Sequence, residues 1–132
     1  HIREKATRLL EAVNLPDQTD TISKNLAYGQ QRRLEIARAL ASEPTLLLLD
    51  EPAAGMNESE TEDLHDIIMN IRDMGVTVLL IEHDMPLVMK TCDRIVVLNF
   101  GEKIAEGEPE DIQNNDEVIE AYLGVEEDDG IA

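Results

Sequence analysis

Residues 46–52 read Leu-Leu-Leu-Leu-Asp-Glu-Pro, an aliphatic run that ends in two adjacent carboxylates and a proline. A short, wholly apolar run is typical of a strand buried on both faces, as in a parallel sheet. In such sheets the chemistry takes place beyond the carboxyl ends of the strands. The run therefore predicts a buried strand that carries Asp50 and Glu51 to a sheet edge, although a plain strand ending in an acidic loop would read the same way.

Further helices and strands alternate along the chain on both sides of this run. Apolar spacing and β-branched runs predict helices over residues 2–15, 30–42, 59–74, 109–113 and 116–123, and strands over 76–81, 94–98 and 103–106. The turn at residues 99–102 predicts a hairpin, in which the last two strands pair side by side. The order of elements predicts an α/β fold, with parallel strands flanked by helices and an antiparallel strand near Gly101.

Two of these helices have a clear apolar face. The predicted buried stripe of the 59–74 helix consists of Leu64, Ile67, Ile68 and Ile71, and Gly75 is placed to end that helix. For the 30–42 helix the predicted face consists of Leu34, Ala37, Leu40 and Ala41. Pro86 suits the first turn of a short helix after the 76–81 strand.

Composition narrows the classes of function. The 132 residues carry a formal net charge of −18, and such a field repels nucleic acid and anionic lipid. Cys92 is the only cysteine, so neither a disulfide framework nor a cysteine-based metal site forms within the chain. The apolar runs are too short to cross a bilayer. The sequence starts at His1 within a predicted helix, and we expect it to be part of a longer protein.

Two further segments could carry chemistry. Residues 26–30, Leu-Ala-Tyr-Gly-Gln, lead directly into a helix, and a glycine there lets backbone N–H groups approach a phosphate at the positive end of the helix dipole. An ordinary loop and helix cap would give the same pattern. His83 follows the 76–81 strand and could hydrogen-bond a phosphate or an attacking water, although a lone histidine is more often structural.

The combination of these segments resembles the ABC ATPases. Residues 25–33 (NLAYGQQRR) are similar to the signature segment of that family, residues 34–40 (LEIARAL) to the helix that follows, residues 46–52 to its Walker B strand, and His83 to its switch histidine. The resemblance covers residues 25–107 and implies the carboxy-terminal part of the ABC ATPase domain, a P-loop NTPase fold, with a remnant of its helical subdomain.

The resemblance also implies a role for each matched residue. Asp50 looks like the carboxylate that holds Mg²⁺ through water, Glu51 like the catalytic base, and His83 like a contact to the γ-phosphate of ATP. The signature positions look like the residues that reach the ATP of a dimer partner. They are Leu26, Ala27, Tyr28, Gly29 and Gln30. Gly55, Met56 and Asn57 correspond to the loop that links the two nucleotide sites.

A narrower resemblance, to the ATPase subunits of branched-chain amino acid importers, rests on other stretches. These are Tyr28 and the segments PAAGMN at 52–57, IEHDM at 81–85, VLNFGEKIAEG at 97–107 and EAYLG at 120–124. It implies a second ATPase subunit and transmembrane permease subunits as partners, no nucleic acid, and a place at the cytoplasmic face of the inner or plasma membrane.

The sequence departs from the family in three respects. No Gly-x-x-x-x-Gly-Lys-Ser/Thr segment is present, so the usual phosphate cradle with its lysine is missing. The adenine-stacking aromatic and the glutamine loop that senses the membrane partner are missing as well. Ala27 replaces a common serine and Asn57 a common aspartate. We therefore expect this chain alone to be inactive and to self-associate or be partly disordered.

The resemblance divides the chain into three parts. Residues 1–43 would belong to the helical subdomain with the signature, residues 44–108 to the ATPase core, and residues 109–132 to terminal helices and an acidic, disordered tail. Two other functions remain open. One is a non-transport ABC ATPase in translation or DNA repair. The other is a non-catalytic module that binds a partner through its acidic face.

Overall fold

The structure, a computed structural model, describes residues 1–15, 20 and 27–124. The chain divides into two compact units, His1–Ile81 and Glu82–Ala132, called here the amino-terminal and the carboxy-terminal unit. The acidic tail and signature residue Leu26 lie outside the described residues, so the prediction of a disordered tail stays a prediction. In the described part of the chain, no helix is long and apolar enough to span a membrane.

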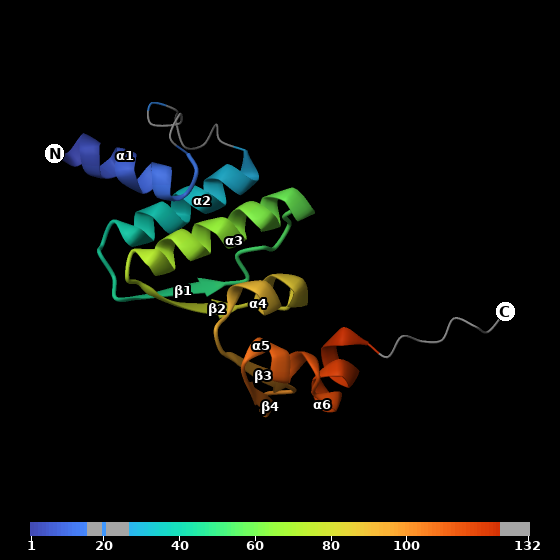
Figure 1. Ribbon diagram of the computed structural model, residues 1–132. Coiled ribbons are helices and arrows are strands. Elements are labelled where there is room, and N and C mark those ends of the chain that lie inside the picture. Colours follow the sequence, from blue (N-terminus) through green and yellow to red (C-terminus); the bar gives the residue numbers. More distant parts are fainter. Residues whose placement is uncertain (16–19, 21–26, 125–132) are drawn as a thin grey trace. The chain divides into compact units, whose positions relative to one another are not determined.

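The amino-terminal unit is a layer of helices on a pair of strands. Its elements are α1 (Ile2–Ala12), α2 (Tyr28–Leu40), β1 (Leu46–Asp50), α3 (Glu58–Asp73) and β2 (Thr77–Ile81). The two strands pair in parallel, from Leu46 opposite Thr77 to Asp50 opposite Ile81. α3 lies between α2 and the strands (Figure 1). This confirms the predicted α/β class and brings the carboxyl ends of β1 and β2 to one edge.

Helix α3 has the buried stripe that its apolar spacing predicts. Leu64, Ile67, Ile68 and Ile71 are all buried, and Gly75 follows the helix with φ of 88°. A left-handed φ favours glycine because it has no Cβ to clash with the backbone. The predicted end of the helix is therefore confirmed.

For α2 the predicted face is partly wrong. Ala37 and Leu40 are buried, but Ile36 completes the face, whereas Leu34 is half-buried and Ala41 is exposed. The helix starts at Tyr28 and ends at Leu40, so Ala41 lies beyond its last turn. With 3.6 residues per turn, positions 36, 37 and 40 lie on one side.

The prediction that the strand at residues 45–49, which ends at Asp50, is buried on both faces is wrong for this structure. Burial along β1 alternates, with Leu47 and Leu49 buried and Leu46 and Leu48 exposed. The reason is that within the amino-terminal unit the helices lie on one side of the two-stranded sheet (Figure 1). Alternate side chains of a strand point to opposite faces, so half of each strand remains open.

The carboxy-terminal unit is a hairpin packed with short helices. It contains α4 (Met85–Thr91), β3 (Ile95–Asn99), β4 (Glu102–Gly107), α5 (Pro109–Gln113), α6 (Asp116–Val118) and the π-helix η3 (Ile119–Leu123). Strands β3 and β4 pair antiparallel with an irregularity between Val97 and Leu98. The predicted hairpin is confirmed, and Pro86 lies in the first turn of α4 as expected.

One small core holds this unit together. Its buried members come from α4, β3, α5 and α6: Val88, Ile95, Val97, Ile112 and Val118. The predicted helix over residues 116–123 is two consecutive segments, because regular α geometry ends at Val118 and a π-helix continues the chain. The Tyr122 hydroxyl donates a hydrogen bond to the Leu98 carbonyl, which fastens η3 to the hairpin.

Candidate functional site

Asp50 and Glu51 lie at the carboxyl edge of the parallel strand pair. Asp50 is the last residue of β1, and its register partner is Ile81, the last residue of β2. The Glu51 backbone N–H donates to the Ile81 carbonyl at 2.8 Å, so the two strands stay paired up to this point. Both carboxylate residues are exposed. The sequence thus correctly predicted two carboxylates at a sheet edge.

The backbone at Glu51 turns sharply. Its φ is 47°, which is a left-handed conformation that non-glycine residues adopt rarely and at some energetic cost. The Ala54 N–H then donates to the Glu51 carbonyl at 3.1 Å, and the Met56 N–H donates to the Ala53 carbonyl at 3.0 Å. These turns form a compact loop, residues 51–57, that joins the carboxylates to α3.

Asn57 starts α3 and anchors that loop. Its Oδ1 accepts the Glu60 backbone N–H at 2.8 Å, and Glu60 Oε2 accepts the Asn57 backbone N–H at 3.2 Å. This reciprocal pair is a capping box, which satisfies helix-start N–H groups that would otherwise lack partners. Asn57 therefore caps α3. The sequence analysis noted only that Asn57 replaces an aspartate that is common in the family, and it did not predict this cap.

The described part of the signature segment begins α2. Gln30 Oε1 accepts the Ala27 backbone N–H at 3.2 Å, and the Ala27 carbonyl accepts the Gln31 N–H at 2.9 Å. Ala27 itself has no side-chain atom that could cap the helix. Tyr28 is exposed, with the Arg32 guanidinium 5.6 Å from its ring centroid. The segment thus presents a helix start, where backbone N–H groups favour an anion.

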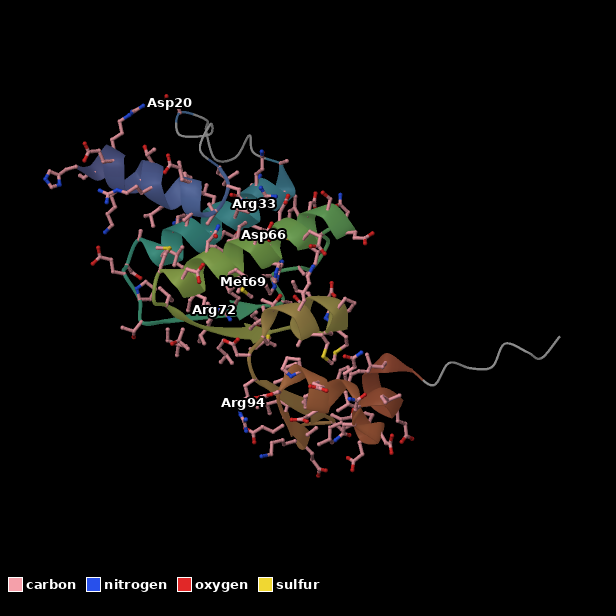
Figure 2. The ribbon with its side chains drawn as sticks, in the orientation of Figure 1. Asp20, Arg33, Asp66, Met69, Arg72 and Arg94 are labelled. Carbon is pink, nitrogen blue, oxygen red and sulfur yellow. The ribbon has the colours of Figure 1, made fainter. Side chains whose placement is uncertain are left out.

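The structure brings the signature helix and the 51–57 loop together. A methyl group added to Gly55 would lie 3.4 Å from Tyr28 Cε1, and one added to Gly29 would lie 3.5 Å from Glu60 Cδ. One turn further along, Arg33 Nη2 lies 3.1 Å from Asp63 Oδ2. Figure 2 shows where Arg33 lies on α2. Two segments that the sequence suggested separately are therefore neighbours within one unit.

His83 belongs to the carboxy-terminal unit. Its imidazole is exposed, its Nδ1 lies 3.5 Å from Glu82 Oε1, and its backbone N–H donates to the same oxygen at 3.1 Å. The Glu82 side chain is only 1% exposed. Sequence reasoning named His83 and missed this buried carboxylate, although the Glu-His pair stands in the sequence directly after β2.

Sequence reasoning also missed Arg33, Glu60 and Asp63. One signal was readable for Glu60, because Asn57 followed three residues later by a glutamate is a capping-box pattern. The pairing of Arg33 with Asp63 joins two helices 30 residues apart in sequence. No local pattern indicates a contact at that separation.

The donor chemistry at the edge of β1 suits a hard cation only in part. Among the described residues no group of three or more His, Cys, Asp or Glu side chains is arranged to hold a metal ion. Mg²⁺ usually takes only one or two carboxylates and completes its shell with water and phosphate oxygens. Exposed Asp50 supplies one such oxygen ligand, and it fits Mg²⁺ that arrives with a nucleotide.

A separate cavity lies elsewhere in the amino-terminal unit. It measures about 500 Å³ and is lined by residues of α1, the end of α2, the segment before β1 and the segment between α3 and β2, including Lys5, Arg8, Leu40 and Val76. None of its lining residues is a predicted site residue. It therefore takes no part in the site at the edge of β1.

Comparisons with known proteins show which families the chain resembles. The family described as ABC transporter matches residues 1–54, and the family described as branched-chain amino acid ATP-binding cassette transporter matches residues 102–128. Both stretches thus match families of ABC transporter proteins. Its fold is that of the ABC ATPase cassettes.

Individual curated proteins are similar to this chain over most of its length. It is 55% identical over 122 residues to the high-affinity branched-chain amino acid transport ATP-binding protein BraF of Pseudomonas aeruginosa. The match covers 92% of this chain and 48% of BraF. The chain is 51% identical to LivG of Escherichia coli, described by the same transport function, with the same coverage. The chain thus spans about half the length of these curated relatives.

A solved structure supports the fold independently. The ADP conformation of MJ1267, an ATP-binding cassette of an ABC transporter, is similar to this structure with a TM-score of 0.81 at 32% sequence identity. The match covers 92% of this chain and 50% of that one. This agrees with the resemblance drawn from the signature segment and the strand that ends at Asp50.

Proposed function

We propose that this chain is the carboxy-terminal half of an ATP-binding subunit that energises the import of branched-chain amino acids by hydrolysing ATP. One observation carries the proposal. Asp50 and Glu51 stand at the carboxyl edge of the parallel strand pair, and the loop after them contacts the start of a helix with a signature sequence. The amino-terminal unit thus contains two acidic residues and a helix start whose backbone N–H groups favour a phosphate, and this combination suits phosphoryl transfer.

Glu51 is the proposed general base. Its carboxylate accepts a proton from the water that attacks the γ-phosphorus, an O–P bond forms, and the bond to ADP breaks. A positioned base of this kind contributes about 10²- to 10⁴-fold in rate. The left-handed turn at Glu51 supports the role, because strained backbone is often found at active sites.

Asp50 and His83 have separate proposed roles. Asp50 is the proposed ligand of Mg²⁺ through water, and the bound ion would neutralise charge on the phosphates. His83 is the proposed contact to the γ-phosphate, and its closeness to the buried Glu82 carboxylate supports a fixed ring orientation. These roles come from the resemblance and from the polar chemistry of each residue.

Residues 26–30 are the proposed contact to the ATP of a second subunit. Ala27 has no hydroxyl to donate, so any hydrogen bond at that position comes from backbone N–H groups at the start of α2. Loss of a hydrogen bond to a charged group costs about 1.5–3 kcal/mol where nothing replaces it. The partners proposed are a second ATPase subunit and transmembrane permease subunits.

The substrate class rests on the named relatives. BraF and LivG are described as acting in high-affinity branched-chain amino acid transport, and a matching family covers residues 102–128. The location proposed is the cytoplasmic face of the membrane, where the subunit would bind its permease. ATP hydrolysis would then drive release of an amino acid on the cytoplasmic side.

Transport in a reconstituted system tests this function. The intact ATPase subunit that contains this chain is placed with its permease in vesicles, and uptake of labelled leucine, isoleucine or valine is measured with ATP. We expect uptake of these amino acids that requires ATP and is not competed by lysine or glutamate. Uptake without a preference for aliphatic amino acids would contradict the substrate, and absence of ATP hydrolysis would contradict the function itself.

The 132-residue chain alone provides a second test. The sequence holds no phosphate-cradle motif, so titration of the chain with Mg-ATP is expected to release no measurable heat. The intact subunit serves as the positive control under the same conditions. Micromolar binding by the chain alone would show that phosphate is held without that motif.

A further inference from the structure

The cavity of about 500 Å³ in the amino-terminal unit lies away from the carboxylates of the candidate site. Its lining residues come from α1, from the end of α2 and from the segments that lead into β1 and β2. The cavity therefore lies where these strands begin, whereas Asp50 lies where β1 ends (Figure 1). Cavities that bind small molecules measure about 300–1,000 Å³, so this one is large enough for a ligand of its own.

Most of the cavity wall is apolar. Leu40 at the end of α2 and Val76 before β2 are buried, and Leu9 on α1 is half-buried. Met74, which follows α3, also lines the cavity and is 53% exposed. An aliphatic group that enters the cavity would remove this surface from water, which favours binding. The wall thus selects for a ligand with an alkyl chain.

Two cations on α1 and one carboxylate form the charged part of the wall. Lys5 Nζ lies 3.2 Å from Glu43 Oε1 and donates to the Ala41 carbonyl at 3.2 Å. Arg8, one turn further along α1, has no hydrogen bond or ion pair with any other residue that the structure describes. With histidine counted as neutral, the lining residues carry a net charge of +1. This local charge is opposite in sign to the −18 of the whole chain, and it matches a ligand with one negative charge.

Glu43 has an unusual backbone conformation at the edge of the cavity. Its φ is 54°, in the left-handed region where glycine or asparagine usually follows a helix. Its N–H donates to the Leu40 carbonyl at 3.0 Å, and its carboxylate reaches Lys5. Such backbone conformations cost stability and are often found at binding sites. Because Glu43 neutralises Lys5, Arg8 is the cation that a ligand can pair with.

We propose that this cavity binds an aliphatic monocarboxylate, whose carboxylate pairs with Arg8 and whose alkyl chain lies on the apolar wall. The planar guanidinium of arginine matches a carboxylate through two parallel N–H···O bonds. A ligand with two or more negative charges fits less well, because the excess charge would face Glu43. An alkylammonium would be repelled by Lys5 and Arg8. The inference does not depend on ATP hydrolysis and goes beyond the proposed function.

Calorimetric titration of the intact subunit that contains this chain tests the inference. The probes are hexanoate, octanoate and decanoate, each kept below the concentration at which it forms micelles. We expect saturable binding of one carboxylate per subunit. Each added methylene group is expected to lower Kd about three- to fourfold until the cavity is full, because it removes further apolar surface from water. Octylamine and octanol, which carry the octyl chain without a carboxylate, are expected to bind at least about tenfold more weakly than octanoate.

Two substitutions separate the charged part of the site from the apolar part. Arg8→Gln is expected to raise the Kd for octanoate about tenfold or more, because a hydrogen-bonded charge pair is lost. Met74→Glu, which places a carboxylate on the apolar wall, is expected to raise it at least as much. Arg3→Gln is the matched control, because Arg3 lies on the same helix but pairs with Asp20 and does not line the cavity. Arg8 and Met74 are exposed, so both variants are expected to unfold thermally within a few degrees of this control.

The possible outcomes decide the inference. Saturable octanoate binding that weakens in Arg8→Gln and Met74→Glu but not in Arg3→Gln supports it. The inference is overturned if the wild-type subunit shows no saturable binding of any of the three carboxylates, or if it binds octylamine or octanol as tightly as octanoate. Octanoate binding that is unchanged in either Arg8→Gln or Met74→Glu also overturns it, because the ligand then lies elsewhere. Since ATP hydrolysis is not measured, failure of the proposed function leaves these outcomes unaffected.

Discussion

Replacing Asn57 with alanine removes the cap of α3 at the point where the 51–57 loop ends. Asn57 Oδ1 accepts the Glu60 N–H at 2.8 Å, and this acceptor is lost in Asn57→Ala. The site is exposed, so water replaces part of the bond. The bond from the Thr61 hydroxyl to the Asn57 backbone carbonyl, at 2.9 Å, does not depend on the side chain. We therefore expect a loss of about 1 kcal/mol in the free energy of unfolding.

Asn57→Asp is the informative companion of that change. Aspartate keeps the acceptor, and its charge gains about 0.3–1 kcal/mol at a helix start. The Glu60 carboxylate, which accepts the backbone N–H of residue 57, would repel the aspartate and oppose that gain. We expect a net change within about 0.5 kcal/mol of the wild type.

Urea denaturation of the intact subunit, followed by far-ultraviolet circular dichroism, measures both changes. Ser59→Ala, at an exposed position in the same turn of α3, is the control and is expected to be nearly neutral. The midpoint is expected to shift for Asn57→Ala without a change in slope, which marks a change in stability alone. An Asn57→Ala variant as stable as Ser59→Ala would refute the capping argument.

Three further results are expected. Ile67 is 0% exposed in the stripe of α3, so Ile67→Ala is expected to lower the free energy of unfolding by about 2–5 kcal/mol, measured by the same urea denaturation. A decrease below about 1 kcal/mol would show that the stripe is not part of a core. The 132-residue chain self-associates through the open sheet face, and Leu48→Asp with Leu79→Asp lowers its mass in light scattering; an unchanged mass would exclude that face. The pKa of the Cys92 thiol is raised mainly by burial and further by the negative charge of Asp93. Iodoacetamide is therefore expected to react with Cys92 more slowly near pH 8 than with a free thiol. A reaction rate equal to that of glutathione would contradict this.

Local patterns predicted the parts of the fold that one segment decides alone. The stripe on α3 follows from spacing, the end of that helix from Gly75, and the start of α4 from Pro86. Asp50 and Glu51 were predicted at a sheet edge because an apolar run ended at them. In each of these cases the responsible residues are neighbours in sequence, so their chemistry is visible without the fold.

Features that depend on distant contacts were not predicted. The exposure of Leu46 and Leu48 depends on what covers the sheet, and four leucines in a row give no sign of it. The contact of Arg33 with Asp63 and that of Tyr28 with Gly55 each join separate elements. Ile36 lies on the buried face of α2 with Ala37 and Leu40, and the elements that pack on the helix decide which of its faces is covered.

The central claim is that Glu51 takes the proton from the attacking water, and one variant tests it most directly. In Glu51→Gln the amide cannot accept that proton, so the intact subunit is expected to lose at least about 100-fold in ATP turnover while equilibrium ATP binding stays unchanged. Glu102→Gln, at an exposed position in β4, is the control and is expected to keep normal turnover. Retained turnover in Glu51→Gln with the control unchanged would contradict the assignment of Glu51 as the base.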